Sequence, residues 1–364
     1  MSPSVERPSC LLSRSSRTEP DTFPRVDVWA ARAYANGIGT DRARTVAGAV
    51  ARVVALQGQD VGANRLAVRV RSDGLTRQDV DDAVSNGDVV RTWAMRGTLH
   101  MLAAADLKWV LDEVGAYFRD RQAPRRRRLG LDDADCERGV AQLESILTEP
   151  LTRAEIRERV DLDLAGQAAP YFLGFAALEG VICRGPERGR EPTYVLVRDW
   201  VTRHEHDHLA LRYLRGHGPA TPRDLAAWSG LPLAAARRAF DDVRDALEPV
   251  GERFVVKGDE CVESIETRLL GHFDAFVLGY GERSIPVEHT RKIQSGGGFV
   301  MPSVSVGGRI RGVWRLSTKD TLDVTPFTTI SARLRRELSS EVADLGRFLG
   351  RKIKLSVAGV AAAD

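Results

Sequence analysis

Two glutamines, Gln57 and Gln59, stand one residue apart and are followed by Asp60. A glutamine side chain offers a carbonyl oxygen and two amide protons, so this pair could hold a water molecule or face a developing cation. Neither amide is a strong base, and Asp60 is the neighbour that could supply a carboxylate base. The competing interpretation is structural, because two amides after a helical pattern can simply cap the C-terminal end of that helix.

Other arrangements that could carry chemistry have less support. His204, His206 and His208 alternate along the chain, and on a helix this spacing spreads three side chains around the axis instead of gathering them on a metal ion. We therefore interpret them as the polar start of a helix. The sequence contains no G-x-S-x-G, P-loop or H-E-x-x-H motif. The four cysteines stand far apart without a C-x-x-C pair: Cys10, Cys136, Cys183 and Cys261. We expect no metal and no cofactor.

Basic residues gather in two places. One set is a run of arginines interrupted by Pro124, which we expect to weaken a helix there: Arg119, Arg121, Arg125, Arg126, Arg127 and Arg128. A solvated face and a phosphate-binding surface are equally good interpretations of this run. The second set surrounds a Gly-rich predicted hairpin: Arg283, Arg291, Lys292, Arg309, Arg311 and Arg315. A hairpin with basic flanks suits insertion into a nucleic-acid groove, and the alternative is an ordinary amphipathic hairpin.

Composition sets the class of protein. The chain has 364 residues, 53 of them Lys or Arg and 50 Asp or Glu, which gives a net charge of +3. With 43% hydrophobic residues the chain can bury several cores, so fibrous and disordered classes are excluded and two to three domains are expected. No apolar run is long enough to cross a bilayer, and we expect a cytoplasmic protein; the family resemblance described below implies association with the nucleoid. The mild charge permits a polyanionic partner where the positive residues cluster.

The elements that position the glutamines follow from periodicity. A helical pattern over Arg42–Leu56 ends at the two amides, and Leu66–Arg71 alternates apolar and basic residues as a strand does. Leu75–Val84 starts with a threonine cap and returns to helical spacing. Val89–His100 is typical of a β-hairpin.

The same cassette recurs along the chain. Leu151–Val160 and Ala220–Trp228 repeat the threonine-capped start, and each is followed by a helix and two extended segments. Three such units predict tandem winged helices in an α+β fold. The last third differs: Phe299–Trp314 is expected to form a hairpin that turns at Gly307–Gly308, and Ser331–Gly350 a terminal helix packed on this β-rich layer.

We divide the chain accordingly. The predicted parts are a flexible leader (1–25), a first winged helix with the catalytic loop (26–120), a second (121–204), a third (205–262) and a C-terminal β-rich region with a hairpin and a terminal helix (263–364).

Several segments resemble a known family, the bacterial winged-helix DNA glycosylases of the AlkZ and YcaQ type, over about residues 26–355. The resemblance rests on Leu56–Asp60, Phe273–Asp274, Leu278–Tyr280 with Arg283–Ser284, and above all on Arg91–His100, which reads Arg-Thr-Trp-Ala-Met-Arg-Gly-Thr-Leu-His. It implies three winged helices in a C-shaped clamp that binds duplex DNA. It also implies excision of N7-alkylated guanines, including interstrand crosslinks made by natural-product toxins.

The family signature of Gln, a hydrophobic residue and Gln falls on Gln57 and Gln59. The YcaQ branch has Asp in the last place, so this sequence is more similar to the AlkZ branch, although Gly58 departs from the hydrophobic middle residue. The resemblance implies that a wing lines the catalytic face, with DNA-binding candidates Arg91, Trp93, Arg96, Thr98 and His100. For Trp93 and Met95 the alternative is core packing. The predicted hairpin would probe the groove with Arg309 and Arg311 near its turn.

The chemistry is consistent with amides. An N7-alkylated guanine is already cationic, so it leaves as a neutral base without a general acid, and positive charge builds on the deoxyribose instead. The expected function is therefore a monofunctional DNA glycosylase that acts as a monomer on double-stranded DNA carrying alkylated guanine. A non-catalytic winged-helix regulator or lesion-shielding resistance protein is the alternative.

Overall fold

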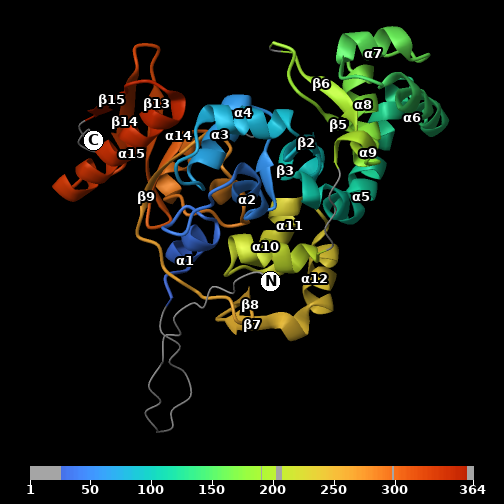
Figure 1. The fold of residues 1–364 in the computed structure, drawn as a ribbon. Helices are drawn as coiled ribbons and strands as arrows, with labels where there is room; N and C mark the ends of the chain where they lie inside the picture. The colour runs from blue at the N-terminus through green and yellow to red at the C-terminus, as the bar shows by residue number, and fades with distance from the viewer. Residues whose placement is uncertain (1–25, 190, 202–206, 297–298, 359–364) are drawn as a thin grey trace, which may run out of the picture.

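The computed structural model describes residues 26–189, 191–201, 207–296 and 299–358. Within them a short helix, α1 (Val28–Ala35), precedes three successive units, and a C-terminal sheet follows (Figure 1). The mixed helix and strand content confirms the α+β class. His204 and His206 lie outside the described residues, as do Cys10 and the predicted leader.

The first unit carries the predicted site. Its elements are α2 (Val46–Ala51), β1 (Ala55–Gln57), α3 (Val61–Arg69), α4 (Arg77–Ser85), β2 (Val89–Trp93) and β3 (Leu99–Ala103). The hairpin of β2 and β3 and the helix after Thr76 confirm the predictions. The helix expected to reach Leu56 ends at Ala51, since the chain turns at Val54 with a φ of 66° and then pairs as β1.

The strand predicted over Leu66–Arg71 is wrong, because these residues belong mostly to α3. Asp60 caps that helix by accepting a hydrogen bond of 2.7 Å from the Ala63 amide. Arg69 and Arg71 are both about 1% exposed and form ion pairs. The alternation of apolar and basic residues therefore does not separate a buried face from a solvated one.

A long helix, α5 (Leu107–Arg128), leads from the first unit to the second. Contrary to the prediction, Pro124 does not interrupt it. The buried Arg126 guanidinium donates to the Arg119 carbonyl oxygen at 2.6 Å and lies 4.7 Å from the ring centre of Phe175, which holds the last turn in place. The domain boundary placed at residue 120 falls inside this helix.

The second and third units repeat the element order of helix, strand, two helices and two strands, which is that of a winged helix. The second comprises α6 (Asp133–Ile146), β4 (Leu151–Thr152), α7 (Arg153–Arg159), α8 (Ala168–Leu178), β5 (Ile182–Arg184) and β6 (Thr193–Leu196), followed by α9 (Val197–Trp200). The third comprises α10 (Leu209–His217), α11 (Pro222–Ser229), α12 (Leu233–Asp242), β7 (Leu247–Val250) and β8 (Arg253–Val256). In the third unit a bridge between Ala220 and Phe254 replaces the first strand.

The threonine caps seen in the sequence do not all mark the same element. Thr152 and Thr221 form capping boxes with Glu155 and Asp224 at the second helix of their units. Thr76 forms its capping box at the third helix of the first unit. The three units are present, but the threonine-capped helix that the sequence pattern matched is the third helix in the first unit and the second helix in the other two.

The first two units share one six-stranded sheet in the order β1-β3-β2-β5-β6-β4, joined where Arg91 pairs with Arg184. In Figure 1 the second unit and the C-terminal sheet project on opposite sides of the first unit, and the third unit lies beneath it. Over the described residues, no helix is long and apolar enough to span a membrane.

The C-terminal region is a five-stranded sheet covered by the terminal helix, as predicted. The sheet order is β15-β14-β13-β12-β9, and α15 packs on it through Leu338, Val342 and Leu345. The elements are β9 (Thr267–Leu270), α13 (Ala275–Leu278), α14 (Thr290–Ile293), β10 (Gln294–Gly296), β11 (Phe299–Val300), β12 (Ser303–Val306), β13 (Arg309–Leu316), β14 (Thr321–Pro326), α15 (Ala332–Leu349) and β15 (Lys354–Val357).

The turn at Gly307–Gly308 joins β12 and β13 as predicted, but α1 covers it. A Cβ atom on Gly308 would lie 2.0 Å from the Trp29 carbonyl oxygen, so only glycine allows this contact. Arg309 forms an ion pair of 2.9 Å with Asp27 at the start of α1. Contrary to the expectation, this turn is occupied by α1 and is not free to enter a groove.

Buried ion pairs tie α3 of the first unit to the C-terminal region. Arg71 follows α3 and binds both carboxylate oxygens of Asp274, at 2.9 and 2.7 Å, and both side chains are 0% exposed. Arg69 pairs with Glu341 and Asp344 of α15. Because each charge depends on its partner for compensation, the two regions must fold together.

Replacing Asp274 with Ala should lower the free energy of unfolding by about 3–5 kcal/mol, because it leaves the buried Arg71 charge uncompensated. Asp112→Ala is the control, since the Lys108–Asp112 pair is exposed and is expected to contribute less than about 1 kcal/mol. Urea unfolding followed by circular dichroism measures both changes. Equal losses in the two variants would contradict a stabilising role for the Arg71–Asp274 pair.

Candidate active site

The two glutamines lie where a strand of the first unit gives way to a helix. Gln57 is the last residue of β1 and stands opposite His100 of β3, while Gln59 directly precedes Asp60, the cap of α3. The capping interpretation is therefore wrong, because no helix ends at these residues. Asn64 of α3 donates a hydrogen bond of 3.2 Å to the Gln57 carbonyl oxygen and fixes the backbone between them.

Gly58 permits the close approach of this segment to β3. Its amide donates to the Leu99 carbonyl oxygen at 2.8 Å. A Cβ atom here would lie 3.0 Å from the His100 carbonyl carbon and 3.1 Å from its Cα. The departure from a hydrophobic middle residue thus has a steric reason in this chain.

A chain of hydrogen bonds orients the two amides. Arg96 Nη2 donates to Gln57 Oε1 at 2.8 Å, and Gln57 Nε2 donates to Gln59 Oε1 at 3.1 Å and to Thr98 Oγ1 at 3.3 Å. Gln57 is half-buried and Gln59 exposed. The side-chain carbonyl group of Gln57 therefore faces the positive charge of Arg96, and its side-chain NH2 group faces Gln59 at the surface.

Arg96 carries a positive charge whose described hydrogen-bond partners are all neutral. Its guanidinium donates to the Gln57 amide oxygen and to the Trp228 carbonyl oxygen, and lies 2.9 Å from His100 Nε2. Within the described part of the chain no carboxylate forms an ion pair with it. Burial, and then the positive charge of Arg283, lower the pKa of Arg96 to about 10. Arg96, which contacts Gln57, and Arg283, whose charge acts on Arg96, form no ion pair with a carboxylate among the described residues, and this favours the binding of an anion such as a backbone phosphate.

His100 is held in one neutral tautomer. Its Nε2 must accept from Arg96, and its Nδ1 must donate to the Thr98 carbonyl oxygen at 2.9 Å. Burial, followed by the charge of Arg96, lowers the pKa of His100 to about 3. This imidazole therefore offers no proton to a leaving group at neutral pH.

The predicted site residues separate into three groups. Those gathered around the glutamines are Arg96, Thr98, His100 and, through its field on Arg96, Arg283. A second group is exposed on the C-terminal region and has no described contact with the glutamines: Arg291, Lys292, Arg311 and Arg315. Those engaged elsewhere are Arg91, Trp93 and Arg309.

Arg91 and Trp93 face the second unit instead of the glutamines. Arg91 is 3% exposed and forms an ion pair of 2.9 Å with Glu187. Trp93 packs against the cores of the first and second units, and Met95 is fully buried. The packing alternative therefore describes Trp93 and Met95, because the sheet shared by the two units covers this side of the wing.

Sequence analysis missed the contribution of the third unit. The Trp228 carbonyl oxygen accepts a hydrogen bond from Arg96 across 132 positions of chain, and Gly230 contacts the same arginine. The only sequence signal was a glycine after α11, which is typical of a helix C-cap. Asp60, kept as a possible base, is occupied in capping α3.

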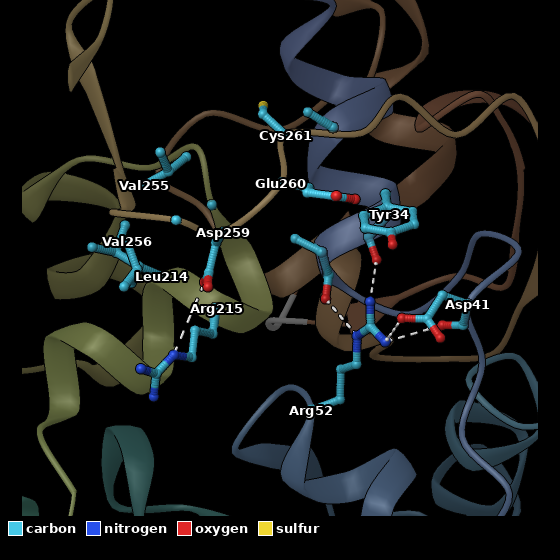
Figure 2. A pocket seen from close by; sticks show the side chains of 14 residues that line it. Tyr34, Asp41, Arg52, Leu214, Arg215, Val255, Val256, Asp259, Glu260 and Cys261 are labelled. Atoms are coloured by element: carbon cyan, nitrogen blue, oxygen red, sulfur yellow. Dashed lines mark hydrogen bonds and ion pairs between the residues drawn. The ribbon is translucent and has the colours of Figure 1, made fainter. Parts of the chain in front are cut away.

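A separate cavity lies away from the glutamines, and its Arg52 is fully engaged by neighbouring oxygen atoms. Figure 2 shows this pocket of about 320 Å³ between α1, α10 and the segment that follows β8. Its Arg52 donates to the carbonyl oxygens of Tyr34, Ala35 and Asp41 and to the Asp41 carboxylate (Figure 2). The described residues contain no group of three or more His, Cys, Asp or Glu side chains that could hold a metal ion.

Comparisons with known proteins agree with the geometry. Residues 50–348 match the family model described as DNA glycosylase AlkZ-like. A relative from Streptomyces sahachiroi, named interstrand DNA cross-link repair glycosylase, is 28% identical over 337 residues, which are 83% of this chain and 90% of the relative. The solved structure of Streptomyces sahachiroi DNA glycosylase AlkZ is 25% identical with a TM-score of 0.80, covering 91% of this chain and 98% of that one.

Nuclear magnetic resonance should show His100 neutral throughout pH 5–8, because its pKa lies near 3. Arg96→Leu should raise that pKa by removing the nearby charge, while burial still keeps it below the ordinary value of about 6.5. His217, whose burial also lowers its pKa to about 3, is the internal control and should not respond. Since unfolded imidazoles protonate near pH 6.5, both histidines should make the fold less stable as the pH falls below that value. A His100 resonance that titrates near pH 6.5 in the unaltered protein contradicts the assignment.

Proposed function

This chain belongs to the AlkZ-like DNA glycosylase family, and from that premise we propose that it hydrolyses the N-glycosidic bond of cationic N7-alkylguanine in duplex DNA. The observation that carries the proposal is the hydrogen-bonded set of Arg96, Gln57 and Gln59, next to a histidine that stays neutral. This set offers fixed dipoles and one positive charge but no acid of suitable pKa.

The absence of an acid suits a substrate that needs none. Alkylation at N7 gives guanine a positive charge, so the base leaves neutral when the bond to C1′ breaks, and the deoxyribose becomes the cation. Gln59 Oε1 accepts from Gln57, whose own oxygen is bound to Arg96, and this polarisation orients the amides before the reaction. An amide oxygen at the exposed end of the set can face the sugar cation or hold the water that attacks it. Unmodified purines, which need protonation to leave, should be poor substrates.

The charges of Arg96 and Arg283 have a separate task. An arginine whose hydrogen-bond acceptors are all neutral retains the capacity to bind an anion, and the anion nearest any nucleotide is its phosphate. We infer that these two residues hold the phosphate beside the lesion and so bring the sugar to the glutamines. Thr98 supports the same arrangement because its hydroxyl oxygen accepts from Gln57.

The exposed position of Gln59 favours a substrate that remains within the duplex. A base covalently linked to the opposite strand cannot rotate far into a deep pocket, and an exposed set of amides does not require it to do so. The name of the Streptomyces sahachiroi relative, an interstrand DNA cross-link repair glycosylase, supports including crosslinks among the substrates. Self-protection against a natural-product genotoxin is part of this proposal, as are monomeric action and a location on the nucleoid.

We infer a monofunctional enzyme that uses water. The described partners of the two glutamines are Arg96, Thr98 and Asn64, and none of them is a lysine that could form a Schiff base. The alternative is a non-catalytic protein that binds or shields the lesion. That alternative shares the DNA-binding arginines, so binding alone does not separate the two functions, whereas release of the free base does.

Replacing Gln57 or Gln59 with Ala should slow release of 7-methylguanine from duplex DNA by about 10²–10³-fold, as loss of a preorganised polar contact does, while DNA binding is retained. Gln78→Ala is the matched control, because Gln78 lies in the same unit and donates to Asp82 at the surface of α4. Release is measured by chromatography of the free base. Unchanged release in both site variants contradicts the assignment, and binding without any release by the unaltered protein supports the alternative.

Arg283→Ala and Arg311→Ala should each weaken DNA binding and reduce the slope of log K against log salt concentration by about one unit. Arg309→Ala should change this slope less, because Asp27 already neutralises that side chain. Titrations by fluorescence anisotropy at several salt concentrations measure the three slopes. A larger change of slope for Arg309→Ala than for Arg311→Ala would contradict the assignment of Arg311 as a phosphate contact.

A further inference from the structure

The turn between α11 and α12 of the third unit lies directly against the site. Gly230 ends α11 in the left-handed region with a φ of 79°. A Cβ atom on it would lie 2.9 Å from both Cα and Cγ of Arg96 and 3.1 Å from Cζ of Phe118. The absence of a side chain at Gly230 therefore makes room for the backbone and the side-chain stem of Arg96.

The same turn supplies an acceptor for the guanidinium. Arg96 Nη1 donates to the Trp228 carbonyl oxygen, which is the one acceptor of this arginine that comes from outside the first unit among the described residues. The Trp228 ring is buried beside Tyr213 and His217, with ring centres 5.2 and 5.4 Å apart. The core of the third unit thus determines where this oxygen lies.

Local hydrogen bonds stiffen the turn. Ser229 Oγ donates to the Leu225 carbonyl oxygen at 2.7 Å and accepts from the Leu231 amide at 3.2 Å. Arg96 itself has a φ of 56°, a strained conformation for a residue with a side chain. Such a backbone persists when its surroundings hold it, and the surroundings on this side are Trp228 and Gly230.

We propose that the α11–α12 turn is a positioning element of the active site, in which the Trp228 carbonyl oxygen and the missing side chain of Gly230 aim Arg96 at Gln57. The first unit carries the two glutamines, and the third unit completes their orientation. Gly230 acts through Arg96 and is a positioning residue, since it is not required to touch the substrate. This inference rests on the proposed function, because it assigns Arg96 and Gln57 to base release.

Gly230→Ala should slow single-turnover release of 7-methylguanine by about 10²-fold, the cost of a displacement near 1 Å, and the rate is measured at saturating DNA because a displaced Arg96 also weakens its phosphate contact. Gly251→Ala is the matched control. Gly251 also has a positive φ, 60°, and lies in the turn between β7 and β8 of the same unit, but no other side chain or backbone comes within 4 Å of its Cβ position. Gly230→Asn is the second variant, because asparagine tolerates a positive φ yet still brings a Cβ atom against Arg96. It carries the test if Gly230→Ala does not fold.

A double-mutant cycle separates positioning from general destabilisation. In an Arg96→Ala background there is no guanidinium to displace, so Gly230→Ala should cause no further loss of rate. A loss of equal size in both backgrounds means that Gly230 is merely structural. If the unaltered protein releases base and the Gly230 variants match Gly251→Ala, the inference is wrong and the proposed function stands. If the unaltered protein releases no base, the proposed function itself fails.

Discussion

The arrangement depends on one half-buried cation, Arg96, for which the described residues supply no anionic partner. A carboxylate beside Arg96 would form a stronger, charge-assisted bond with the guanidinium and would compete with the Gln57 amide oxygen for it. Because its acceptors are an amide, a backbone carbonyl group and an imidazole, the positive charge still acts on its neighbours. That charge orients Gln57 and contributes to keeping His100 neutral, and under the proposed function it also binds a phosphate.

The arrangement around Arg96 forms only because segments far apart in the sequence come together in the fold. The pairing of β1 with β3 sets Gln57 opposite His100, and Gly58 allows the strands to come close. On the other side of the glutamines, α3 is fixed by the buried Arg69 and Arg71 to the C-terminal region. The same region supplies Arg283, so the ion pairs that stabilise the fold also hold the two halves of the site in register.

The sequence was most informative where function depends on local spacing. Gln57, Gln59, Arg96, Thr98 and His100 all lie in two short stretches of sequence, and the pairing of β1 with β3 brings those stretches together. It was misleading where tertiary contacts override a local pattern. The arginines of α3 are basic yet buried in ion pairs, and Pro124 lies within a continuous helix because Arg126 anchors its last turn.

Contacts between units could not be predicted at all. Arg91 has the positive charge expected of a DNA-binding residue, but the sheet that joins the first two units places it in an ion pair with Glu187. Arg309 stands near a flexible-looking glycine turn, but α1 covers that turn. The Trp228 carbonyl group is invisible to any motif because it belongs to the backbone, and only its place in the fold makes it useful.

The left-handed backbone of Arg96 lowers the stability of the fold at a residue whose side chain the proposed reaction needs. A glycine at this position would adopt the same φ without strain, and relief of such strain is worth about 1–3 kcal/mol. Mutants chosen only for survival on heating would therefore be drawn toward losing the guanidinium. Under the proposed function this substitution would gain stability at the expense of base release, so a more heat-stable variant would have to gain its stability at other positions.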